Sequence, residues 1–185
     1  IGNYLTRDLD NLDYVNLEHD IYNYYHESTL EVVEESFKGK DKDKIEELIK
    51  TEIELDNVAK IYRLKKYFNY DNEKIATMIT PVYSRFNKRD IEDMIAANDP
   101  ETIYNYLKDS SYRNYLTDRF LFIEHTTRNI NYNMNRKHLM SSSDADAVLL
   151  TYIYLMGVEI NNIVEIIEGV RYRVPIDEIS KMLIY

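Results

Sequence analysis

Two histidines and their acidic neighbours are the residues in this sequence best suited to metal chemistry. His19 and His26 lie seven residues apart and fall on one face of a predicted helix. Together with the adjacent Glu18 and Glu27 they offer the donor types that bind a divalent transition metal. The same side chains are also usual on the solvated face of a helix, and that is the interpretation we favour. We therefore expect no metal site and no cofactor.

Acidic pairs are the second candidate for metal or acid–base chemistry. Asp10 and Asp13 are close enough in sequence to hold Mg²⁺, as paired carboxylates do in some all-α lyases, but a solvated helix face is the simpler interpretation. Two more pairs lie at predicted turns, where acidic residues stabilise the start of a helix: Asp41 with Asp43, and Asp144 with Asp146. We expect none of these pairs to be catalytic.

Other sequence signatures of catalysis are missing. The chain has no GxxxxGK[ST] loop for a nucleotide phosphate, no HExxH motif and no cysteine. His125 and His138 stand alone in a polar stretch, where we predict surface histidines. No residue is therefore assigned a catalytic role.

The charge balance restricts the partners that the chain can bind. The formal net charge is −10, which repels nucleic acid and anionic lipid. The segments YRLKKY (62–67) and VRYRV (170–174) interleave basic and aromatic residues, which we interpret as acidic-protein contacts or as compensation of a helix dipole. The longest uncharged apolar run, VLLTYIYLMGV (148–158), is shorter than the roughly 20 residues that span a bilayer. We expect neither nucleic-acid binding nor a membrane span.

The elements that position these residues are predicted to be helices. Only 4 glycines and 3 prolines interrupt the chain, and apolar residues recur at intervals of three and four. Long helices are predicted over 10–37, 42–68, 111–138 and 144–169, and short ones over 72–79, 88–97, 100–108 and 175–184. Five residues punctuate them: a turn at Gly39, N-caps at Asp71 and Ser143, and first-turn prolines at Pro100 and Pro175.

Two stretches of the chain resemble each other. IELDNVAKIYRLKKYFNYDNEKIATMI (53–79) aligns with VEINNIVEIIEGVRYRVPIDEISKML (158–183) after one deletion in the turn. The polar matches are Glu54 with Glu159 and Asn57 with Asn162; the others are Val58 with Ile163, Ile61 with Ile166, Tyr67 with Tyr172, Ile75 with Ile179 and Met78 with Met182. Each copy follows a long helix and ends in a short one, so we interpret the pattern as an old duplication of a helical lobe.

The matched polar residues form a candidate structural clamp. Glu54 and Asn57 are three residues apart and share a helix face, as do Glu159 and Asn162. Such a pair on a mostly apolar face is costly unless it is hydrogen-bonded. We expect both pairs to bind unpaired backbone groups at an end of a neighbouring helix. Solvated surface residues and a ligand site are the alternatives, and recurrence in both copies favours the clamp.

The second copy carries two adjacent asparagines, although asparagine is unfavourable inside a helix. Asn162 recurs as Asn57, with a glutamate three residues before it in both copies. Asn161 is matched only by Asp56, which indicates a position that requires a small polar residue. We predict a buried structural role for Asn162 and a solvated position for Asn161.

These motifs resemble a known family. The pattern E-[IL]-x-N-[IV]-x-x-I, followed by a basic and aromatic turn and a short helix, is similar to the C subunit of V-type and A-type rotary ATPases, whose eukaryotic counterpart is the d subunit. The resemblance is carried by TEIELDNVAKIYRLKKYFNYDNEKIATMITP, by DADAVLLTYIYLMGVEINNIVEIIEGVRYRVPIDEI and by the linking stretch FNKRDIEDMIAANDPETIYNYL. It is specific over about 51–107 and 144–184.

The resemblance implies an all-α, funnel-like fold of three pseudo-symmetric lobes, two of which we expect here. They would be residues 1–82 and 111–185, built from long antiparallel and short helices and joined by short helices over 83–110. The chain begins with Ile1 rather than methionine, so we expect the amino-terminal lobe to be missing.

The family's role is that of a non-catalytic adaptor. It would lie peripherally on the cytoplasmic side of the membrane, on the ring of rotor subunits, and receive the foot of the central stalk, so that ATP chemistry is coupled to proton or sodium transport. No cofactor is implied. The competing hypotheses are an unrelated helical scaffold or regulatory interaction domain, and an all-α enzyme that uses clustered carboxylates.

Overall fold

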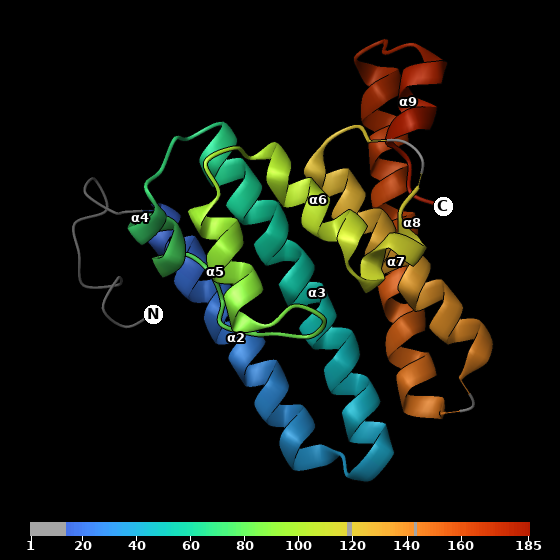
Figure 1. Ribbon diagram of the computed structural model, residues 1–185. Coiled ribbons are helices and arrows are strands. Elements are labelled where there is room, and N and C mark those ends of the chain that lie inside the picture. Colours follow the sequence, from blue (N-terminus) through green and yellow to red (C-terminus); the bar gives the residue numbers. More distant parts are fainter. Residues whose placement is uncertain (1–13, 118–119, 143) are drawn as a thin grey trace.

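The computed structural model describes residues 14–117, 120–142 and 144–185, and all regular structure in these residues is helical (Figure 1). The α-helices are α2 (Tyr14–Ser36), α3 (Gly39–Lys66), α4 (Asn72–Thr77), α5 (Lys88–Ala96), α6 (Glu101–Asp109), α7 (Ile123–Ser141), α8 (Ala145–Arg171) and α9 (Ile176–Met182), with a 3-10 helix, η2, at Ser111–Tyr115. The expected all-α class is therefore confirmed.

Most predicted helices are confirmed to within a few residues, and local hydrogen bonds explain where several of them begin. The Asp71 side chain accepts from the peptide N–H of Lys74 at 2.7 Å and caps α4, as predicted. The predicted cap Ser143 lies outside the described residues, and Asp144 caps α8 by accepting from two peptide N–H groups. The turn expected at Gly39 is placed slightly too late, because α3 already begins at this residue, whose φ of +63° suits glycine.

The single long helix predicted over 111–138 is wrong. The chain forms η2, leaves the helical conformation at Leu116 and resumes it as α7 from Ile123. Tertiary packing explains the break, because Tyr112 in η2 and Phe120 within the break pack on different aromatic partners. The Tyr112 ring lies 5.4 Å from that of Phe86, whereas the Phe120 ring lies 4.7 Å from that of Tyr104.

Helix α3 is the centre of the arrangement. It contacts α2, α5, α6, α7 and α8, and α2 runs antiparallel beside it (Figure 1). The main core forms around it from α4, α5, α6, η2 and α7, and Val58, Ile61 and Ile75 are completely buried there. Since helices from both halves of the chain pack against α3, this helix positions the polar residues that it carries.

Helix α8 is the most apolar helix but is poorly covered. Ala147 and Thr151 are its only fully buried side chains among the described residues. By length and composition alone α8 is apolar enough to cross a membrane, which the short uncharged run in the sequence did not suggest. At its end, α9 packs closely, because Gly169 leaves the space that Ile179 fills: an added Cβ would lie 2.6 Å from Cδ1 of Ile179.

The α2–α3 interface contains both amino-terminal histidines. Burial, together with the charge of Lys60 on α3, lowers the pKa of His19 and that of His26 below the usual 6.5. The charges of Asp20 and Lys74 also act on His19, in opposite directions. The folded interface therefore favours the neutral form of both imidazoles, and protonation of either one destabilises it.

We predict that the contribution of His19 and His26 to the free energy of unfolding decreases as the pH falls from about 7.5 to about 5. At these two side chains the folded state binds fewer protons than the unfolded chain, so their contribution is present above pH 6.5 and is lost as the pH falls through the lowered pKa values. Urea denaturation at several pH values, with the double variant His19→Gln/His26→Gln for comparison, measures the effect. A double variant with the full pH dependence of the natural chain would contradict the assignment.

Candidate functional site

Asn57 on α3 binds the chain just beyond α4. Its amide Nδ2 donates to the carbonyl of Thr80 at 2.7 Å, and its Oδ1 accepts from the peptide N–H of the same residue at 3.2 Å. The Thr80 hydroxyl also bonds Asn23 of α2. Both Asn57 and Thr80 are buried, so this pair satisfies two buried main-chain groups of Thr80 and ties three elements together.

Glu54, one helical turn earlier, holds the next part of the same connection. Its carboxylate is 0% exposed and accepts from three consecutive peptide N–H groups, at 3.0 Å from Ser84, 2.7 Å from Arg85 and 2.9 Å from Phe86. The Tyr112 hydroxyl lies 3.5 Å away. Burial raises the pKa of the Glu54 carboxyl, and the three N–H donors act in the opposite direction.

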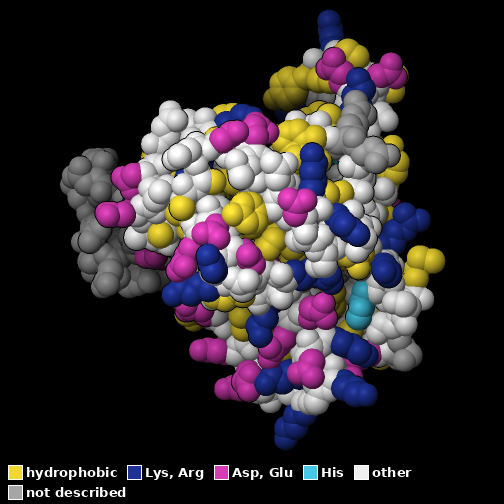
Figure 2. Space-filling model, in the orientation of Figure 1, with side chains coloured by type: hydrophobic (Ala, Val, Ile, Leu, Met, Phe, Trp, Pro, Cys, Tyr) yellow, Lys and Arg dark blue, Asp and Glu magenta, His cyan; other side chains and the backbone are white. Residues whose placement is uncertain are grey.

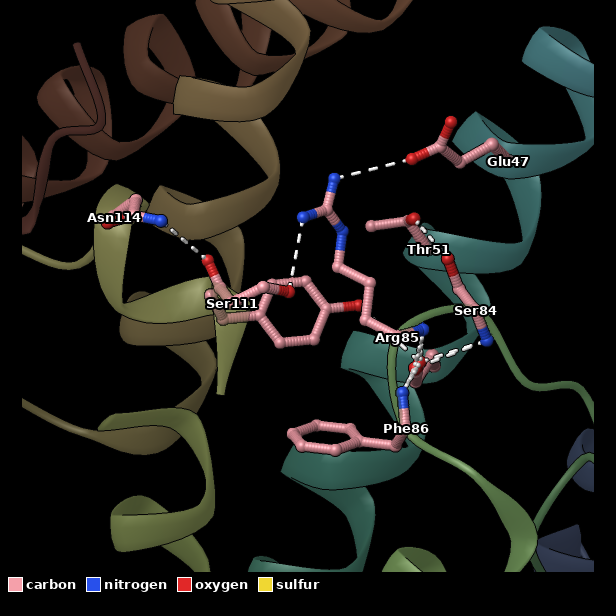
Figure 3. Close-up of polar contacts among 9 residues, drawn as sticks. Glu47, Thr51, Ser84, Arg85, Phe86, Ser111 and Asn114 are labelled. Carbon is pink, nitrogen blue, oxygen red and sulfur yellow. Dashed lines mark hydrogen bonds and ion pairs between the residues drawn. The ribbon is translucent and has the colours of Figure 1, made fainter. Parts of the chain in front are cut away.

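The side chain of Arg85 is fixed beside this carboxylate site (Figure 3). Its guanidinium bonds the Ser111 hydroxyl at 3.2 Å and Glu47 at 3.3 Å, and it lies over the rings of Tyr112 and Tyr115. Figure 3 also shows the Ser84 hydroxyl paired with Thr51 of α3, at 2.8 Å. The Ser84–Phe86 segment is therefore held on both its backbone and its side chains.

Asn162 on α8 repeats the bonds of Asn57. Its Nδ2 donates to the carbonyl of Ile184 at 2.6 Å, and its Oδ1 accepts from the Ile184 peptide N–H at 3.1 Å. Ile184 lies two residues after α9, much as Thr80 lies three residues after α4. Asn161, in contrast, is exposed.

Glu159 is the one member of the four that the structure leaves open. It is exposed, and among the described residues it has no hydrogen-bond or ion-pair partner. It lines a cavity of about 370 Å³ together with Asn162 and Ile184. The structure thus brings Glu54 and Asn57 onto one segment, residues 80–86, whereas Asn162 holds its own partner and Glu159 holds none.

The partners of these side chains were not identified from the sequence. They are backbone groups of Thr80, of Ser84–Phe86 and of Ile184, and any residue type except proline offers the same peptide N–H. One sequence signal was available. Asn87 and Asp90 form a capping box at the start of α5, which marks the residues just before it as lying outside a helix.

The candidates for metal chemistry do not assemble in the described residues. No group of three or more His, Asp or Glu side chains lies close enough there to hold a metal ion. His19 instead contacts Asn23 at 2.9 Å, and Asp10 and Asp13 lie outside the described residues. The surface position predicted for His125 is wrong: this residue is buried, because α7 turns it toward the protein, where it contacts Asn129.

We predict that Glu54→Gln lowers the free energy of unfolding by about 2–3 kcal/mol, because one acceptor oxygen is replaced by an amide N–H₂ that faces buried N–H donors. Urea denaturation measures the change. Glu92→Gln is the matched control, since Glu92 is exposed and forms a surface ion pair with Lys88 at 3.6 Å, and it should produce no measurable change. Equal shifts for the two variants would disprove the role of Glu54.

Asn162→Leu should cost about 1–2 kcal/mol, because leucine has a similar volume but leaves both polar groups of Ile184 without partners. Asn161→Ala, on the exposed side of the same helix, should leave the thermal midpoint nearly unchanged. Thermal denaturation followed by circular dichroism compares the two. Similar midpoints for both variants would remove the distinction between the adjacent asparagines.

Comparison with known proteins identifies the family. Neither the curated proteins nor the solved structures include a match. The family model of the ATP synthase (C/AC39) subunit matches residues 1–182, which is nearly the whole chain. The resemblance seen in the Glu-x-x-Asn helices is thereby confirmed, and the chain belongs to the ATP synthase (C/AC39) subunit family, which provides the C or d subunit of V/A-type ATPases.

Proposed function

We propose that the chain is a non-catalytic central-stalk adaptor of a V/A-type rotary ATPase and couples the rotor shaft to the ring of membrane rotor subunits. The observation that carries the proposal is the family match over residues 1–182. The partners would be the central-stalk and rotor-ring subunits of the same complex. The chain itself would bind no nucleic acid and need no cofactor for this role.

The packing of the connections supports a mechanical role. An adaptor that transmits torque must resist bending where its helices are joined, and the joint between α4 and α5 is held by buried hydrogen bonds from Asn57 and Glu54. A loop fixed by several bonds to one rigid helix has few conformations into which it can yield.

We also propose two lobes, over residues 1–82 and 111–185, connected by residues 83–110. Support comes from the order of the helices, which is long, long and short in α2, α3 and α4 and again in α7, α8 and α9. The equivalent turns after α3 and α8 each contain a left-handed residue, Asn69 with φ of 49° and Arg173 with φ of 57°. In this arrangement Glu54, Asn57, Glu159 and Asn162 would be the polar clamps of the two lobes.

The adaptor proposal is tested by isolating an affinity-tagged chain from its native membranes under mild detergent. Mass spectrometry of the eluate should detect stalk and rotor-ring subunits of the ATPase, and an untagged strain is the control. Recovery of the chain without any other part of the ATPase would favour the alternative of an unrelated helical scaffold or regulatory interaction domain.

A peripheral position at the cytoplasmic face follows from the same proposal, although α8 alone is apolar enough for a span. Washing the membranes at alkaline pH should release the chain, because this treatment removes peripheral proteins and leaves spanning helices in the bilayer. Added protease should cleave it only where the cytoplasmic face is accessible. Retention in the washed pellet would contradict the peripheral assignment.

A further inference from the structure

In the first copy, the helix that carries Glu54 and Asn57 is covered by the segment that follows α4. The three N–H groups of Ser84–Phe86 bind Glu54, and α5 follows directly, burying Ile91 and Met94 in the core around α3. A bent segment and an amphipathic helix therefore have separate roles: the N–H groups of the segment satisfy the carboxylate, and the helix covers the apolar side of the core.

The second Glu-x-x-Asn helix has the same polar geometry without that cover. Asn57 and Asn162 make the same pair of bonds, each to the N–H and the carbonyl of one residue beyond a short helix. Glu159 precedes Asn162 by three residues, as Glu54 precedes Asn57, so each carboxylate lies on the same face as its asparagine. At Glu159, however, the described residues provide no N–H donors.

The apolar neighbours of the two pairs differ sharply in burial. Val58 and Ile61 are 0% exposed, whereas their counterparts Ile163 and Ile166 are 51% and 40% exposed. Hydrophobic side chains are visible at the projecting end of the molecule that α8 and α9 form (Figures 1 and 2). The other exposed apolar residues of α8 are Leu149, Tyr152, Ile153, Met156, Ile160, Val164, Ile167 and Val170. So large an apolar surface around an open carboxylate indicates a binding surface.

We propose that Glu159 and the exposed apolar face of α8 bind a polypeptide segment of another protein, with the chemistry of residues 84–95. That segment has three consecutive peptide N–H donors in a bend of the backbone, followed by an amphipathic helix. The Glu159 carboxylate would accept the three N–H groups, and the helix would cover Ile163 and Ile166. The inference rests on the hydrogen bonds of the first copy and does not depend on the function proposed above.

Two other occupants fit the surface less well. A second copy of the chain that presented its own α8 would bring no donors to Glu159, because the N–H groups within that helix are already bonded to its carbonyls. A lipid bilayer would cover the isoleucines, but a carboxylate in hydrocarbon is costly and finds no N–H partner there. Of the three occupants, a polypeptide segment with free N–H groups and an apolar helix satisfies both the carboxylate and the apolar face.

The test uses a blocked, fluorescent peptide of residues 82–97 (VYSRFNKRDIEDMIAA) as the probe, titrated with the full chain and followed by fluorescence anisotropy. Binding should be saturable, and both Glu159→Gln and Ile163→Asp should weaken it at least about tenfold. Glu168→Gln, at another exposed position of α8, is the matched control and should leave the affinity unchanged. A peptide N-methylated at Arg85 and Phe86, which lacks two of the donors, should bind as weakly as Glu159→Gln makes the natural peptide bind.

The variants all lie at exposed positions, so unchanged thermal midpoints will show that they are folded. Absence of binding, or equal binding by Glu159→Gln, would overturn the proposal. So would a concentration-dependent dimer that Ile163→Asp abolishes and the peptide does not dissociate, because a second copy would then cover the face. Vesicle binding that competes with the peptide and is insensitive to Glu159→Gln would assign the face to lipid instead.

Discussion

The arrangement depends on one buried carboxylate. Glu54 lies in the middle of α3 and accepts three consecutive peptide N–H groups, so the chain that leaves α4 bends around this carboxylate before α5 begins. A buried charge without such donors would be strongly unfavourable. The direction of α5, and of the core that α5 and α6 build on α3, is therefore set by a side chain that makes no contact with solvent.

The asparagine one helical turn after the glutamate also satisfies main-chain polar groups, but with an amide instead of a carboxylate. An amide side chain has a donor and an acceptor side by side, so it can pair with the N–H and the carbonyl of a single residue. Asn57 and Asn162 do this for Thr80 and Ile184, which lie where a short helix has just ended. The two side chains therefore satisfy different main-chain groups. The carboxylate accepts N–H groups that precede a helix, and the amide pairs with the N–H and the carbonyl of one residue that follows a helix.

The two Glu-x-x-Asn helices differ in what surrounds them. Helix α3 is covered on most sides and provides the fixed frame of the chain, whereas α8 presents an apolar surface with an open carboxylate. For a member of the ATP synthase (C/AC39) subunit family, such a division suits a part that is internally rigid yet has to engage other components of an assembly. Binding at α8 would use the same physical interactions that α3 uses inside the fold.

The sequence by itself determined the helical class, most helix boundaries and the family, because apolar periodicity, helix caps and the Glu-x-x-Asn spacing are local properties. It also singled out Asn57 and Asn162. Only the tertiary structure decided the break between η2 and α7, the burial of His125, the exposure of α8 and the donors that reach Glu54. Periodicity shows which face of a helix is apolar, but not whether another element covers it. Peptide N–H groups occur in every residue except proline, so no residue type reveals which of them a carboxylate will meet.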